Sequence, residues 1–215
     1  YAPMTTNMNE KGRQTKLLAA VAVLAMVVCA LAIAMPASES DAVAELPTAE
    51  EGVYTLKDST YGSSTAPIQM KAQESGDISF VLGNGDEDAK SSTVYLTYEA
   101  TSTALNLFST GKLTITGPIT VYITVTCDDS TTTARALYNM DVALKGGATL
   151  VLTSGEKVAS QIWWNSDAEN PKTLTLGTEG DSEDFGKLVL DSAGGFSSVN
   201  ANLSGKSSVV PQNTE

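Results

Sequence analysis

The sequence predicts an all-β protein, built as a right-handed parallel β-helix (a solenoid) after an N-terminal hydrophobic helix. Three observations lead to this prediction. Apolar and polar residues alternate with a period of two in many short segments, which is the pattern of half-buried strands. Glycine, proline and asparagine separate these segments, as turn residues do. A short phrase, a turn residue followed by alternating leucine or isoleucine, recurs along the chain.

The first 44 residues differ from the rest and predict an export signal or a membrane anchor. Lys11, Arg13 and Lys16 form a basic cluster, and the uncharged apolar run 17–35 follows. This order, ending in a small polar stretch, is typical of a secretory signal. The run is also long enough to span a bilayer as a helix, so a cleaved signal and an uncleaved anchor are both open. Either one places residues 45–215 outside the cytoplasm, because the positive flank stays inside.

Two small-residue motifs near this run are suitable cleavage sites. Ala42-Val43-Ala44 predicts Glu45 as the first residue after cleavage, and Ala32-Ile33-Ala34 is a second motif closer to the apolar run. Without cleavage, residues 17–35 are expected to hold the protein in the membrane.

Residues 75–200 are predicted to form the β-rich domain, between a linker at 45–74 and a polar C-terminal tail at 201–215. No amphipathic helix is expected after residue 45. The clearest alternation places one set of side chains toward the core: Ile119, Val121, Ile123 and Val125. The intervening set is expected to face outward: Thr120, Tyr122, Thr124 and Thr126.

The recurring phrase favours a β-helix over the main alternative, an antiparallel β-sandwich. The phrase begins at Gly111, Gly147, Pro171 and Gly186. Its spacing is unequal, as in β-helix rungs that carry loop insertions. Each rung would turn its leucine and isoleucine side chains inward, and stacking of the rungs would bury a continuous core.

Two versions of the phrase, Gly111-Lys112-Leu113-Thr114-Ile115-Thr116-Gly117 and Gly146-Gly147-Ala148-Thr149-Leu150-Val151-Leu152, lie in an acidic chain rich in serine and threonine. With the basic cluster and the signal before them, they resemble adhesin-like surface proteins of archaea and bacteria over roughly residues 75–200. Proteins of this kind often carry right-handed β-helices of the pectin-lyase-like type. The resemblance therefore implies such a fold at a cell surface.

The composition argues against several function classes. The chain has 13 Lys and Arg, 25 Asp and Glu, a net charge of −12, no histidine and 2 cysteines. Nucleic-acid binding is not expected, because phosphates are bound by clusters of lysine and arginine. Without histidine, the usual serine and cysteine triads and the commonest zinc ligand are missing. Two cysteines are too few for a disulfide-dense scaffold or a cysteine-based zinc site.

Polysaccharide lyases and hydrolases share the β-helix fold, so an enzyme is the first alternative. Asp128-Asp129 is an adjacent acidic pair, but the polar residues that follow predict a solvated turn. Residues 45–215 contain a single arginine, Arg135, and their lysines are scattered. We therefore expect no enzyme activity and no catalytic residue.

Calcium is the one metal that the sequence suggests. Two glycine-flanked turns are rich in oxygen ligands: Asn84, Asp86, Glu87 and Asp88 in the first, and Asp181, Glu183 and Asp184 in the second. Neither has the Asp-x-Asp-x-Asp-Gly spacing, so both are predicted to be solvated acidic loops, and no cofactor is expected.

Trp163 and Trp164 are the candidate ligand contacts. Neighbours on a strand face opposite ways, so one ring is expected in the core beside Ile162 or Leu152 and the other outside. An exposed tryptophan can stack on a sugar or a protein partner, unless a flanking loop covers it. Asn202 begins Asn202-Leu203-Ser204, a candidate glycosylation site.

The sequence therefore predicts an exported, non-enzymatic protein of the adhesin type, extracellular or in the cell envelope. It would present a β-rich binding or structural surface to a glycan or protein partner. Besides the enzyme, a second alternative is a subunit of an envelope lattice or filament, because uncapped strand edges recruit other chains.

Overall fold

The computed structural model describes residues 42–43, 45–72, 76–83, 91–154, 162–163, 171–190, 199–203 and 207–211. These residues form strands and their connections, and none of them is in a helix. The predicted all-β class is thus confirmed. The hydrophobic helix expected before residue 36 lies outside the described residues. Among the residues described, no helix has the length and apolar character to cross a membrane.

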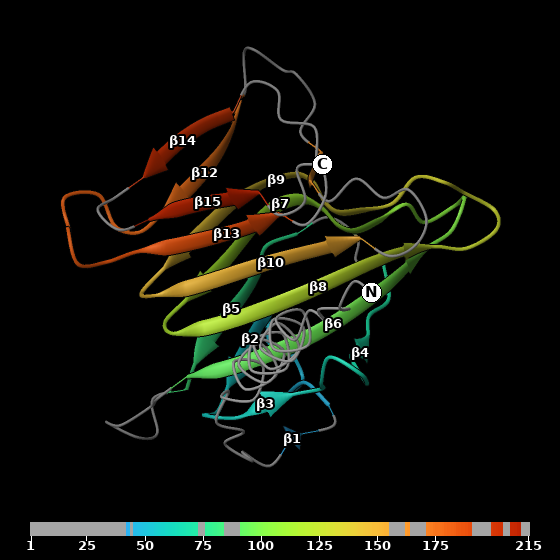
Figure 1. The fold of residues 1–215 in the computed structure, drawn as a ribbon, viewed down its shortest axis with the longest axis horizontal. Helices are drawn as coiled ribbons and strands as arrows, with labels where there is room; N and C mark the ends of the chain where they lie inside the picture. Colours follow the sequence, from blue (N-terminus) through green and yellow to red (C-terminus); the bar gives the residue numbers. More distant parts are fainter. Residues whose placement is uncertain are drawn as a thin grey trace, which may run out of the picture. The chain divides into compact units, whose positions relative to one another are not determined.

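The strands belong to two sheets, which the chain visits in turn. Sheet A contains β1 (Ala42–Val43), β3 (Thr60–Tyr61), β4 (Ile68–Gln69), β6 (Ser92–Ala100), β8 (Ile119–Cys127), β10 (Ala148–Ser154), β13 (Gly186–Leu190) and β15 (Ser208–Pro211). Sheet B contains β2 (Val53–Leu56), β5 (Ile78–Leu82), β7 (Asn106–Thr116), β9 (Arg135–Lys145), β11 (Ile162–Trp163), β12 (Lys172–Leu176) and β14 (Val199–Leu203). Figure 1 shows the long strands of sheet A lying side by side, from β6 in green to β13 in orange.

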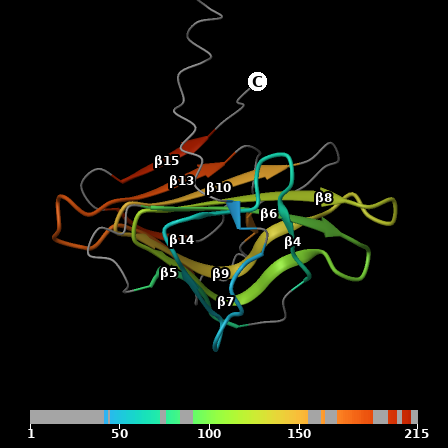
Figure 2. The ribbon, with the colours of Figure 1, turned by 90° about the horizontal axis from the view of Figure 1, so that it is seen from below.

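All pairings between the named strands are parallel. In sheet A, β6 pairs with β8, β8 with β10, β10 with β13 and β13 with β15. In sheet B, β2 pairs with β5, β5 with β7, β7 with β9, β9 with β12 and β12 with β14. Each pass of the chain therefore adds to each sheet either one strand or two short ones, as β3 and β4 do along β6 and β11 and β12 along β9. Figure 2 shows the two resulting layers. This arrangement is a parallel β-solenoid.

The alternative prediction, an antiparallel β-sandwich, is wrong. Such a sandwich requires antiparallel neighbours within each sheet, whereas the antiparallel pairs in the described part are two isolated bridges, Glu50 with Val53 and Thr101 with Ala104. The two layers do face each other as in a sandwich. What differs is the direction of the strands within each layer.

The core fills the space between the two sheets, and the predicted faces of β8 are confirmed. Ile119, Val121, Ile123 and Val125 have no exposed surface, while Thr120, Tyr122, Thr124 and Thr126 are half-buried on the outer side. Strand register stacks inward residues of successive passes, for example Val94, Val121, Leu150 and Leu188 in sheet A. Sheet B has the matching stack Phe80, Ile115, Leu144 and Leu176. Stacking of this kind buries a continuous apolar column.

Both sheets extend beyond the segment 75–200. Strands β2, β3 and β4 lie within residues 45–74, and Leu46 and Ala49 pack against the core from the same segment. At the other end, β15 adds Ser208–Pro211 to sheet A.

Candidate functional site

Strands β7 and β9 carry the same backbone irregularity next to the candidate site. Thr110 and Asn139 both have a φ of 51°, in the left-handed region that most residues avoid. They lie between the register pairs Ser109–Tyr138 and Gly111–Met140, and the offset between the two strands is the same on both sides. Two adjacent strands with the same irregularity bend at the same level, so the sheet bends without losing its pairing.

Arg135 and Tyr138 lie on the same outer side of β9 because alternation breaks between them. Residues three apart on a regular strand face opposite ways. In β9 the two intervening residues, Ala136 and Leu137, are both fully buried. The flanking arginine and tyrosine are therefore both left on the outside, where both are half-buried.

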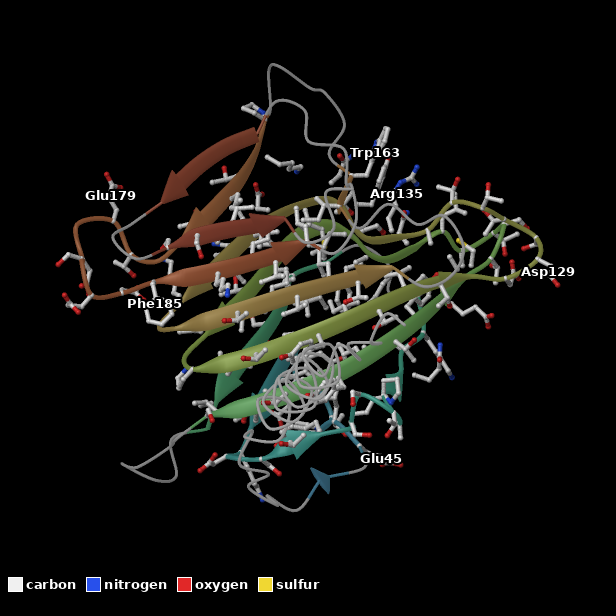
Figure 3. The ribbon with its side chains drawn as sticks, viewed as in Figure 1. Glu45, Asp129, Arg135, Trp163, Glu179 and Phe185 are labelled. Atoms are coloured by element: carbon white, nitrogen blue, oxygen red, sulfur yellow. The ribbon has the colours of Figure 1, made fainter. Side chains whose placement is uncertain are left out.

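Trp163 joins this pair from the short strand β11. Ile162 pairs in register with Leu137 and is fully buried, whereas Trp163 pairs with Tyr138 and is 39% exposed. The Arg135 guanidinium carbon lies 5.2 Å from the centroid of the Trp163 ring and 5.3 Å from that of Tyr138. Figure 3 shows Arg135 and Trp163 close together, away from the long strands of sheet A.

Asn106 completes the cluster from β7, where it pairs in register with Arg135. The Arg135 Nη1 group donates a hydrogen bond to Asn106 Oδ1 at 3.4 Å, while its buried Nε has no hydrogen-bond partner. We call Asn106, Arg135, Tyr138 and Trp163 the Trp163 surface. A cation over an aromatic face gains about 0.5–1 kcal/mol at exposed sites, so the guanidinium holds both rings in place.

The predicted ligand contacts are found only in part. Trp163 faces outward, and Ile162 occupies the core position beside it. Trp164 lies outside the described residues. Asn202 lies in β14, in register with Thr175 of β12, and Ser204 of the same sequon lies outside the described residues.

The acidic pair Asp128-Asp129 closes a turn after β8, as predicted. The Asp128 carboxylate accepts hydrogen bonds from the Ser130 backbone N–H at 2.9 Å and from the Ser130 hydroxyl at 2.5 Å. The Asp128 N–H donates to the Ala100 carbonyl at 2.9 Å. Asp129 is exposed. These bonds tie the turn to the neighbouring pass of the chain.

In the second acidic turn, the carboxylates also accept hydrogen bonds from backbone N–H groups. Asp181 Oδ1 accepts from the Glu183 N–H at 2.9 Å and from the Asp184 N–H at 3.2 Å. Asp184 Oδ1 accepts from the Gly146 N–H at 2.5 Å. A hydrogen bond from Thr178, then those from the backbone of Gly146 and neighbouring residues, lower the pKa of Asp184, against the opposing effect of burial.

The described residues contain no group of three or more cysteine or acidic side chains placed to hold a metal ion. The first acidic turn, with Asn84, Asp86, Glu87 and Asp88, lies outside the described residues. In the second turn, the carboxylate oxygens of Asp181 and Asp184 already accept backbone hydrogen bonds.

Sequence reasoning did not place Arg135, Tyr138 or Asn106 in a site. Two features of the sequence could have pointed to this site. Arg135 is the single arginine of residues 45–215, and two buried apolar neighbours follow it, Ala136 and Leu137. Consecutive inward residues mark a bend in a solenoid strand, but the alternation pattern alone does not show on which side the flanking residues end.

The geometry of this surface is the basis for any functional conclusion, since no residue role can be carried over from a relative. No protein-family model, no curated protein and no solved structure matches this chain.

Proposed function

We propose that this chain is an exported, adhesin-like protein that binds a saccharide through the Trp163 surface without cleaving it. The observation that carries the proposal is the exposed Trp163 ring beside Arg135 and Tyr138. A large aromatic ring provides apolar contact area, and adjacent polar groups fix the orientation of a ligand. Asn106 and Arg135 provide those polar groups.

The fold supports the same proposal. A parallel β-solenoid is the architecture expected from the resemblance to pectin-lyase-like surface proteins, and its stacked strands form two extended sheets. Fold alone does not assign an activity. In the described turns, the acidic residues Asp128, Asp181 and Asp184 accept hydrogen bonds that hold loops together. Such roles favour binding over glycoside hydrolysis, which needs two carboxylates across one bond.

Strand β1 bears on how the N-terminal segment is processed. Ala42 and Val43 pair with Thr60 and Tyr61 of β3. Cleavage before Glu45 would remove β1 from sheet A, whereas cleavage after Ala34 or an uncleaved anchor would keep it. The pairing favours one of these two outcomes over a start at Glu45.

Export is tested with a fusion of residues 4–60 to a reporter that is active only outside the cytoplasm. We expect activity from the fusion, and a clear loss when Lys11, Arg13 and Lys16 are changed to Glu, because the basic flank directs translocation. N-terminal sequencing of the exported full chain then distinguishes an uncleaved segment from a start near Met35 or at Glu45. Full activity of a cytoplasmic reporter on the same segment would contradict the proposal.

Saccharide binding is tested with Trp163→Ala in the full chain, against immobilised pectate, chitin and peptidoglycan. The variant is expected to lose on the order of 1 kcal/mol or more of binding free energy, as for an aromatic hot spot, with an unchanged circular dichroism spectrum. No soluble sugar is expected to be released, with or without calcium.

Phe185→Ala is the matched control, because Phe185 is equally exposed at 38% and lies at the opposite end of the sheets in Figure 3. Equal losses from both variants would show non-specific adhesion. Bond cleavage that disappears in Asp128→Asn or Asp129→Asn would revive the enzyme alternative.

One observation favours the lattice or filament alternative. Val209 of β15 pairs with the inward residue Leu188 of β13, yet Val209 is 40% exposed. The apolar column of sheet A is thus open at this end, next to strand edges that another copy could join. If copies associate there, the full chain should form oligomers in light scattering, and Val209→Lys should abolish them. Thr153→Lys, on the outer face, should not. A monomeric wild type would exclude this alternative.

A further inference from the structure

The guanidinium of Arg135 has more hydrogen-bond donors than the described residues use. An arginine side chain carries five N–H donors. In the part of the chain that the structure describes, the Arg135 guanidinium makes one hydrogen bond, 3.4 Å long, to the neutral amide oxygen of Asn106. In the described part of the chain it forms no ion pair, although acidic residues far outnumber basic ones in the sequence. Its other close neighbours are the rings of Tyr138 and Trp163.

The partners of Arg135 fix its position but do not neutralise its charge. Aromatic rings attract a cation through their faces and leave the edge of the guanidinium free to donate hydrogen bonds. The planar fork of donors matches the two oxygens of a carboxylate, which can accept two parallel hydrogen bonds. An arginine held against two aromatic rings is thus positioned to bind an anionic group of the ligand.

We propose that the Trp163 surface selects acidic saccharides, with a sugar carboxylate on Arg135 and the sugar ring against Trp163. This inference rests on the proposed saccharide binding and narrows its ligand class to uronic acids and other sugars that carry a carboxylate. A neutral sugar would make the aromatic contact and leave the guanidinium unpaired.

The charge of the whole chain limits the kind of anion. At a net charge of −12, a densely charged polyanion such as a polysulfate is repelled over most of the protein. A ligand with one planar carboxylate per sugar can place that group on the one arginine and keep its uncharged ring atoms against Trp163. The charge of the chain therefore favours a ligand with a single carboxylate per sugar over a polysulfate.

The test compares oligogalacturonate with its methyl ester, since esterification removes the charge and keeps the sugar. Binding to the full chain, purified in a neutral detergent, is measured by calorimetry. We expect the acid to bind at least about tenfold more tightly than the ester. Arg135→Gln should remove this difference, Arg135→Lys should keep part of it, and Trp163→Ala should weaken both ligands.

Lys187→Gln is the control for general electrostatics, because Lys187 lies on sheet A, away from the Trp163 surface. It should leave the ratio of acid to ester affinity unchanged. The same loss in Lys187→Gln as in Arg135→Gln would overturn the inference, and so would displacement of oligogalacturonate by dextran sulfate at equal charge concentration.

The outcomes also separate this inference from the proposed function. Equal binding of acid and ester, weakened by Trp163→Ala, would overturn acidic selectivity and leave saccharide binding in place. No binding of oligogalacturonate, its ester or chitin oligomers would overturn both. If Arg135→Gln fails to fold, the ratio of acid to ester affinity measured on the wild-type chain still shows whether the acidic saccharide is preferred.

Discussion

Val121→Asp is expected to destabilise the protein by several kcal/mol, because it places a carboxylate in the middle of the apolar column. Val121 has no exposed surface and lies in register between Val94 and Leu150. A buried, unpaired charge is among the few single changes with so large an effect. The new carboxyl group has to take up a proton or draw water into the core, and either response costs stability.

The matched control is the neighbouring residue on the outer face of the same strand. Thr120 is half-buried and lies in register with Thr93 and Thr149. Thr120→Asp should change the free energy of unfolding by under about 0.5 kcal/mol, as a surface substitution does. Urea unfolding followed by circular dichroism measures both variants. Equal destabilisation would mean that both faces of β8 are covered, contrary to the structure.

The β8 faces could be predicted because alternation is a local property. Every second residue from Ile119 to Val125 is apolar and β-branched, so the inward set follows from the period of a strand alone. The same reasoning predicted that one ring of Trp163 and Trp164 lies outside, but it did not say which one. A single buried neighbour, the fully buried Ile162, was enough to leave the adjacent ring outside.

The assignment of strands to sheets could not be predicted from the same pattern. The four leucines of the recurring phrase do not lie in one sheet. Leu113 and Leu174 lie in sheet B, whereas Leu150 and Leu188 lie in sheet A. Both sheets face one apolar core, so both need the same residue types, and the phrase does not distinguish them. The unequal spacing of the phrase reflects this mixture together with connections of different length.

The Trp163 surface depends on contacts between strands far apart in sequence. Asn106, Arg135 and Trp163 come from three strands and meet only because β7, β9 and β11 are neighbours in register. Tyr138 joins them because the strand bends at Ala136–Leu137. A period of two assumes a straight strand, so it would have placed Tyr138 opposite Arg135.

The second large effect is expected for Gly111→Ala, next to the backbone irregularity that Thr110 of β7 shares with Asn139 of β9. Gly111 has a φ of +123°, a conformation that residues with a side chain rarely adopt. A Cβ atom there would lie 2.2 Å from the Gly76 carbonyl oxygen and 2.6 Å from its carbon. Both are backbone atoms of the neighbouring pass, so the clash cannot be relieved by a side-chain rotation.

Hydrogen bonds on both sides of Gly111 prevent the two segments from moving apart. The Gly76 N–H donates to the Thr110 carbonyl at 2.9 Å, and the Lys112 N–H donates to Asp77 Oδ1 at 2.9 Å. Relief of the clash would break at least one of these bonds, each contributing about 1 kcal/mol. Together with the backbone strain, Gly111→Ala should cost about 3 kcal/mol or more.

Gly180→Ala separates the cost of the clash from the cost of the backbone conformation. Gly180 also has a positive φ, +80°, but no atom lies within 4 Å of the position of its Cβ. Its replacement should therefore cost only the left-handed penalty, about 1–2 kcal/mol. The two variants are compared by their urea midpoints at one pH. If Gly111→Ala is no more harmful than Gly180→Ala, β7 does not approach the turn before β5 this closely.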